Sequence, residues 1–152
     1  MSFPRALVEW LAKTPVSHAF NESNYLFFGG FMALHLLGIA FVLGTSLVLD
    51  LRVFNLGIVN LDFAKIRRVL QPWFITGLAL ALLAGTWLFV ADPIKYYANP
   101  VFHVKIYCLL LAFSSQLLLI NSKSSHLIKP LAAIALASWF GTIISGRIVG
   151  LL

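Results

Sequence analysis

Four histidines are the side chains best suited to chemistry in this sequence, and His35 has the most unusual surroundings. It lies in the apolar segment Phe31–Gly38, where no neighbouring residue carries a charge. A buried imidazole needs a metal or a hydrogen bond, because an unpaired polar group is costly away from water. His35 is therefore expected to be an axial ligand of haem iron or a copper ligand. The alternative is a structural hydrogen bond to a hydroxyl such as that of Ser138 or Thr142.

Two further histidines and two cations fall near the same end of the apolar segments. His103 and Lys105 lie near the start of one segment, Arg147 lies near the end of another, and His18 precedes the first. We expect His103 or His18 to be the second metal ligand beside His35. Lys105 and Arg147 are expected to form a basic pocket for an anion, such as haem propionates, a quinone oxygen or a lipid phosphate. Alternatively, both cations only extend to nearby lipid headgroups.

The depths of the histidines do not by themselves demand a haem with two axial imidazoles. At about 1.5 Å rise per residue, His35 lies roughly 15 Å below the end of its segment and His103 only about 3 Å below its own. His18 and His103 match better in depth, and together they suit a metal site at the outer surface. His126 lies beside serines toward the opposite end and is expected to be solvated.

These side chains must be positioned by four long apolar segments. The segments cover about residues 25–49, 69–90, 101–120 and 131–151, and about 20 helical residues are enough to cross a bilayer. They lack the alternation typical of strands, and an open sheet in lipid would leave backbone groups unpaired. The sequence therefore predicts an all-α fold: an integral membrane four-helix bundle, one membrane domain over 1–152, with both termini on one side.

The composition agrees with a membrane protein. Hydrophobic residues make up 61% and charged residues 11% of the chain, whereas about 25% of the residues of a soluble domain are charged. This excludes a soluble enzyme, a disordered regulator and a nucleic-acid-binding module, and makes the lipid bilayer the first partner. Phosphate-binding loops, Cys-x-x-Cys pairs and zinc-protease motifs are absent.

The beginning of the chain predicts a short helix over about residues 3–13 that lies in the membrane interface. One face of this helix would be apolar and the other charged; the apolar set is Phe3, Ala6, Leu7, Trp10 and Leu11, and the charged set is Arg5, Glu9 and Lys13. Such a helix binds at headgroup depth. The alternative is an amphipathic helix docked on a partner subunit.

The distribution of basic residues predicts the orientation. When the two cations inside the apolar segments are left out, six lie in the loops after the first and third segments, against three on the other side; the six are Arg52, Lys65, Arg67, Arg68, Lys123 and Lys129. Loops rich in Lys and Arg stay in the cytoplasm. Both termini are therefore expected on the periplasmic side of a bacterial inner membrane.

Small residues and one charge pair predict details of the packing. Close helix contacts are expected at residues with short side chains, namely Gly38, Gly44, Gly77, Ala81, Gly85, Ala137, Gly141 and Ser145. Asp50 and Arg52 are expected to form an ion pair at the end of the first span.

Four stretches resemble a family of small, uncharacterised bacterial four-span membrane proteins: Leu7–His18, His35–Gly57, Ile94–Lys105 and Ser138–Val149. That family is similar, more loosely, to the membrane domain of copper-resistance protein D. The resemblance to the copper-resistance proteins implies metal handling at the inner membrane, and their similarity to b-type cytochrome bundles implies haem. The family pattern often has a basic residue in place of His103, which weakens that histidine as a shared ligand.

These observations favour a small inner-membrane redox or metal-handling subunit. It would bind haem b, or copper instead, near the periplasmic face and pass electrons to or from a larger complex or quinone, as an electron-transfer or accessory subunit rather than a stand-alone enzyme. Its expected partners are other membrane or periplasmic subunits. One alternative is a non-catalytic membrane anchor that binds lipid and a partner protein. Another is a copper-handling membrane protein, which the presence of only two methionines disfavours.

Overall fold

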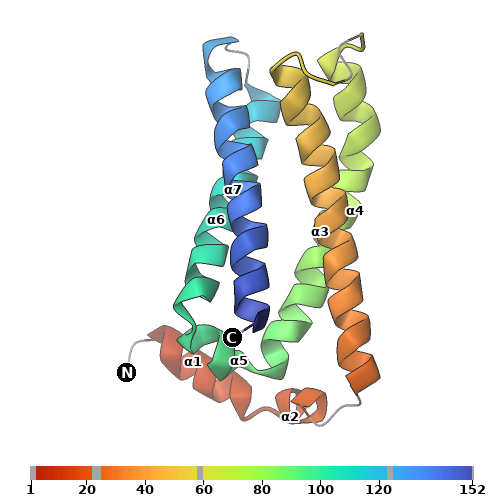
Figure 1. The fold of residues 1–152 in the computed structure, drawn as a ribbon. Coiled ribbons are helices and arrows are strands. Elements are labelled where there is room, and N and C mark those ends of the chain that lie inside the picture. Colours follow the sequence, from red (N-terminus) through yellow and green to blue (C-terminus); the bar gives the residue numbers. More distant parts are fainter. Residues whose placement is uncertain (1–2, 22–24, 58–59, 123–124, 152) are drawn as a thin grey trace.

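The computed structural model describes residues 3–21, 25–57, 60–122 and 125–151, and these residues form helices and no strands. Four long helices run side by side, as Figure 1 shows: α3 (Tyr25–Val53), α4 (Phe63–Ala91), α6 (Pro100–Asn121) and α7 (Ser125–Leu151). Each is long and apolar enough to cross a bilayer. The chain is thus an all-α, multi-pass membrane protein, and the predicted fold class is confirmed.

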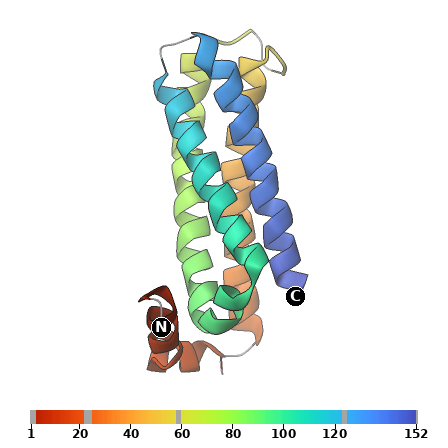
Figure 2. The ribbon, with the colours of Figure 1, turned by 90° about the vertical axis from the view of Figure 1, so that its left-hand side faces the viewer.

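The bundle consists of two helical hairpins. Helix α3 packs along α4, α6 packs along α7, and contacts between α3 and α7 join the two pairs (Figure 2). The centre of the bundle holds an apolar cluster of Val42, Ala112, Ala135 and Trp139, which come from three of the helices. This apolar layer separates two groups of polar residues, one toward each end of the bundle.

The helices extend beyond the predicted apolar segments. α3 continues past residue 49 to Val53, α4 begins at Phe63 rather than near 69, and α7 begins at Ser125 rather than near 131. Pro130 therefore lies inside α7, although the sequence suggests a boundary there. Hydropathy marks the part of a helix that lies in hydrocarbon, whereas the helix itself continues into the polar interface, where its backbone hydrogen bonds remain favourable.

Three short helices gather at one end of the bundle, here called the α1 end: α1 (Phe3–Ala12), α2 (Pro15–Asn21) and α5 (Pro93–Ala98). α1 packs against α5, and α2 against α4. Val8 of α1 is buried, whereas Trp10 is 64% exposed, so this amphipathic helix lies across the end of the bundle. The α2 helix was not predicted, because Pro15 is expected to end a helix; here it begins a new one.

The turn between α4 and α6 is fixed by side-chain caps. The Oδ1 atom of Asp92 accepts a hydrogen bond from the backbone N–H of Lys95 at 3.1 Å and begins α5. The Oδ1 atom of Asn99 accepts one from the backbone N–H of Val101 at 2.9 Å and begins α6. Both caps are followed by proline, whose missing N–H costs nothing in a first helical turn. These caps therefore determine where α6 begins, and with it the position of Lys105 along the bundle.

Close approach of α3 and α4 depends on two glycines. A Cβ atom added to Gly38 would lie 2.7 Å from the Gly77 carbonyl oxygen, and one added to Gly77 would lie 2.8 Å from the Gly38 carbonyl oxygen. No side chain fits there, so the two backbones touch. Gly141 likewise packs on Cys108 of α6, whereas Gly44 has no neighbour within 4 Å and Ala137 is exposed. Only part of the predicted small-residue pattern is therefore used for packing within the chain.

Candidate functional site

A cavity of about 410 Å³ lies between the long helices toward the α1 end. His35, Lys105 and Arg147 all line it, from α3, α6 and α7. The rest of the lining is mainly apolar, with Thr142 and Tyr96 among the polar exceptions. Folding thus brings together three of the five side chains expected to form a site, although they are far apart in sequence.

His35 is held in place by the backbone of the neighbouring helix. Its Nδ1 atom lies 2.7 Å from the carbonyl oxygen of Ala81. A carbonyl oxygen only accepts, so Nδ1 carries the proton and donates it, and Nε2 of the neutral ring keeps its lone pair. Nε2 makes no hydrogen bond to any residue within the described ranges. The imidazole therefore presents a ligand atom, or a proton acceptor, that the described part of the chain leaves unused.

This bond differs from the structural alternative expected from sequence, a hydroxyl of α7. Thr142 lines the same cavity, but its hydroxyl donates to the carbonyl oxygen of Ser138 in its own helix, at 2.9 Å. The close approach of α3 and α4 at Gly38 explains why His35 bonds to α4 rather than α7. It brings the backbone of Ala81 next to the helical turn of α3 that contains His35.

Gly85 provides the space for the imidazole. A Cβ atom added there would lie 2.8 Å from Cε1 and 3.0 Å from Nδ1 of His35, closer than such atoms pack. The ring therefore rests against bare backbone one turn along α4 from its hydrogen-bond acceptor. The sequence pattern predicts Gly85 to be a packing residue and does not indicate this role, because nothing local links it to His35.

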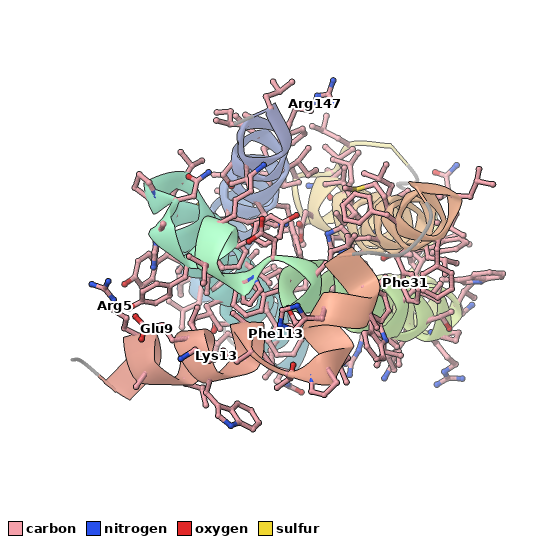
Figure 3. All side chains as sticks on the ribbon, turned by 90° about the horizontal axis from the view of Figure 1, so that it is seen from below. Arg5, Glu9, Lys13, Phe31, Phe113 and Arg147 are labelled. Carbon is pink, nitrogen blue, oxygen red and sulfur yellow. The ribbon has the colours of Figure 1, made fainter. Side chains whose placement is uncertain are left out.

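The two cations occupy different parts of the cavity. Lys105 is partly buried, and its side chain crosses Gly146, where an added Cβ atom would lie 3.4 Å from Cε. Arg147 is exposed and projects from α7 at the periphery of the bundle, as Figure 3 shows from the α1 end. Lys105 therefore places its charge within the cavity and Arg147 at its margin. In the described ranges neither forms an ion pair.

Three aromatic side chains form one part of the cavity lining. Phe89 of α4 stacks on Phe102 of α6, with ring centroids 5.5 Å apart, and Tyr96 of α5 packs against both. Burial raises the pKa of the Tyr96 hydroxyl, and the Asp92 carboxylate raises it further. The phenol therefore stays protonated at neutral pH and remains a hydrogen-bond donor beside the cavity. Tyr96 was not predicted as a site residue, since a tyrosine in a turn carries no distinctive pattern.

The other predicted ligands, His103 and His18, do not line this cavity. His103 is exposed, and its Nδ1 atom lies 3.1 Å from the Asn99 carbonyl oxygen. His18 lines a separate hollow beside α1, together with Arg5, Glu9 and Lys13. No group of three His, Cys, Asp or Glu side chains that could share a metal ion occurs in the part of the chain that the structure describes. His35 is thus the one imidazole of the cavity among these residues.

One predicted contact is wrong. Asp50 does not pair with Arg52; it is fully buried, and its Oδ1 atom accepts a hydrogen bond from Nε2 of Gln116 in α6 at 3.3 Å. The guanidinium of Arg52 instead donates to the Leu61 carbonyl oxygen and to Asn55. Two residues apart on a helix, Asp50 and Arg52 point to different faces.

Comparison with known proteins identifies the relatives of this chain only at the level of a family. Neither a curated protein nor a solved structure matches it. The looser similarity to copper-resistance protein D therefore remains a prediction. A family model described as "Family of unknown function (DUF6644)" matches residues 12–152, which include every helix that lines the cavity. Because the match covers nearly the whole chain, the protein belongs to this uncharacterised family.

Proposed function

We propose that the protein is a small redox subunit of a bacterial inner membrane that binds haem b in the cavity around His35. The observation that carries this proposal is the Nε2 atom of His35, which makes no hydrogen bond within the described ranges, while Nδ1 of the same ring is held by the Ala81 carbonyl oxygen. The apolar cavity around it has Lys105 within it and Arg147 at its margin. An imidazole bound in this way by its other nitrogen is the usual form of a metal-ligating histidine.

The donor set favours haem over a bare metal ion. A porphyrin supplies four nitrogen ligands, so haem iron needs only one or two from the protein. A copper ion bound by protein alone needs several side chains, and the described residues bring no second imidazole or thiolate to His35. Copper remains the alternative metal that the resemblance to copper-resistance protein D suggests.

Each lining residue has a role in this model. His35 would hold the haem iron through Nε2, and the Ala81 carbonyl oxygen would keep its ring oriented. Lys105 and Arg147 would compensate the negative charge of the propionates, and the rings of Phe89 and Phe102 would exclude water. The bound haem would supply one-electron transfer to or from a larger complex, a periplasmic partner or the quinone pool.

A quinone is the second candidate ligand of the same cavity. The quinone alternative is supported by the single imidazole and the protonated phenol of Tyr96 in the cavity lining. A quinone needs polar groups for its oxygens, whereas it needs no second imidazole. His35 would accept a proton from a quinol hydroxyl through Nε2, and the apolar lining would hold the ring.

The test is an absorption spectrum with metal and quinone analysis of protein purified in mild detergent. The haem model predicts a Soret band in the wild type that is lost in His35→Ala. His103→Ala is the matched control and should keep the band, since His103 lies outside the cavity. Circular dichroism checks that both variants fold. Folded wild-type protein without haem, and without a Soret band after haem is added, would refute the haem model; co-purified quinone would then support the second candidate.

A further inference from the structure

A second polar group lies in the half of the bundle opposite the α1 end, around Asp50. This side chain belongs to α3 and is fully buried, and among the described residues it accepts one hydrogen bond, from Gln116. Within the described ranges it forms no ion pair. A buried carboxylate in a membrane bundle is expensive unless a positive charge compensates it.

Three buried oxygens of this group have no hydrogen-bond partner among the described residues: Ser46 Oγ, Asp50 Oδ2 and Gln116 Oε1. Their residues are 0%, 0% and 1% exposed, respectively. Ser46 precedes Asp50 by one helical turn, so both occupy one face of α3, and Gln116 reaches that face from α6. Buried polar atoms are normally satisfied, so the free oxygen of this carboxylate and the two orphaned oxygens of its neighbours indicate a ligand that offers positive charge.

The chemistry of this oxygen set favours a monovalent cation. Carboxylate, amide and hydroxyl oxygens are hard ligands, which suit hard cations rather than copper or zinc. A divalent ion would leave one positive charge uncompensated in the apolar interior, because Asp50 supplies a single negative charge. A water molecule would satisfy the oxygens but leave the carboxylate charge in place. We propose that Asp50, Ser46 and Gln116 bind one Na⁺ ion, for which a proton competes.

This site is independent of the cavity around His35. The apolar cluster of Val42, Ala112, Ala135 and Trp139 lies between the two. On α3, Val42 stands between His35 and Asp50, two turns before the carboxylate. Failure of the haem model would therefore not affect the cation proposal, and the reverse also holds.

The test measures ²²Na⁺ binding to the purified full-length chain in detergent at about pH 8, with choline as the balancing cation. The wild type should bind one Na⁺ per chain in a saturable manner, and Asp50→Asn, which keeps the size of the side chain and removes its charge, should bind none. Asp62→Asn is the matched control, because Asp62 is exposed before α4, and it should bind like the wild type. Ser46→Ala and Gln116→Leu should each weaken binding, by about tenfold for the loss of roughly 1.4 kcal/mol.

Competition by protons provides the second readout. As pH falls below the pKa of the site, the apparent affinity for Na⁺ should fall by up to about tenfold per pH unit, since each ion excludes the other. Circular dichroism and gel filtration establish that the variants are folded. Saturable binding of equal stoichiometry in the wild type and Asp50→Asn would overturn the proposal, and so would the absence of Na⁺ binding in folded wild-type protein.

Discussion

The substitution Gly85→Ala tests whether the shape of α4 determines the position of the imidazole. The added methyl group would lie 2.8 Å from Cε1 and 3.0 Å from Nδ1 of His35. Relief of this overlap requires the ring to move, and the ring is held by a 2.7 Å hydrogen bond to the Ala81 carbonyl oxygen. We therefore expect the substitution to weaken or break this bond while leaving the other residues of the cavity unchanged.

The magnitude follows from comparison with Gly44→Ala. Gly44 lies in a helix with nothing within 4 Å of an added Cβ atom, so both substitutions share the gain in helix propensity of about 1 kcal/mol. Gly85→Ala additionally loses a buried hydrogen bond, worth about 1–3 kcal/mol when one partner is left unsatisfied. The variant should thus be less stable than Gly44→Ala by about 1–3 kcal/mol, and under the haem model it should bind haem about 10–100-fold more weakly.

The assay is unfolding in mixed detergent micelles followed by circular dichroism, in wild-type and His35→Ala backgrounds. Without the imidazole the methyl group meets no ring, so the difference between Gly85→Ala and Gly44→Ala should shrink to within about 0.5 kcal/mol. A difference of the same size in both backgrounds would refute the reasoning, because the cost would then come from another contact of α4.

Two further predictions follow from the packing and the charges. Gly38→Ala should destabilise the bundle by about 1–3 kcal/mol, because its methyl group meets the backbone of α4. Gly30→Ala is the control and should not destabilise it, because nothing lies within 4 Å of the added Cβ atom. Equal unfolding free energies of the two variants would contradict this prediction. Burial and Asp92 raise the pKa of Tyr96, so its phenol stays protonated in the folded chain after an unfolded tyrosine ionises at about pH 10. The stabilisation that the protonated Tyr96 phenol contributes is therefore complete below about pH 10. It is lost as the pH rises through the higher pKa of Tyr96 in the folded chain. In Asp92→Asn, which keeps a side chain able to cap α5, the tyrosinate absorbance of Tyr96 should develop at lower pH, and an unchanged titration would exclude the Asp92 effect.

The amino-acid sequence determined the fold class and the depth of the polar residues. Four apolar segments with polar ends leave few arrangements in lipid, since every backbone group must be paired within its own helix. The distance of a residue from the end of its segment then fixes its depth, which is why Lys105 and Arg147 were expected at the same end of the bundle as His35, and all three line one cavity.

Tertiary structure alone decided which way each helix is rotated. These spans are apolar on all sides, because lipid and protein interior favour the same residues, so local periodicity does not show which face turns inward. The contact of Gly38 with Gly77 sets the rotation of α3 against α4 and gives His35 the Ala81 carbonyl instead of a hydroxyl of α7. The same rotation turns Asp50 toward Gln116 on the other hairpin. Its separation from Arg52 needs no tertiary contact, because residues two apart on one helix point to different faces.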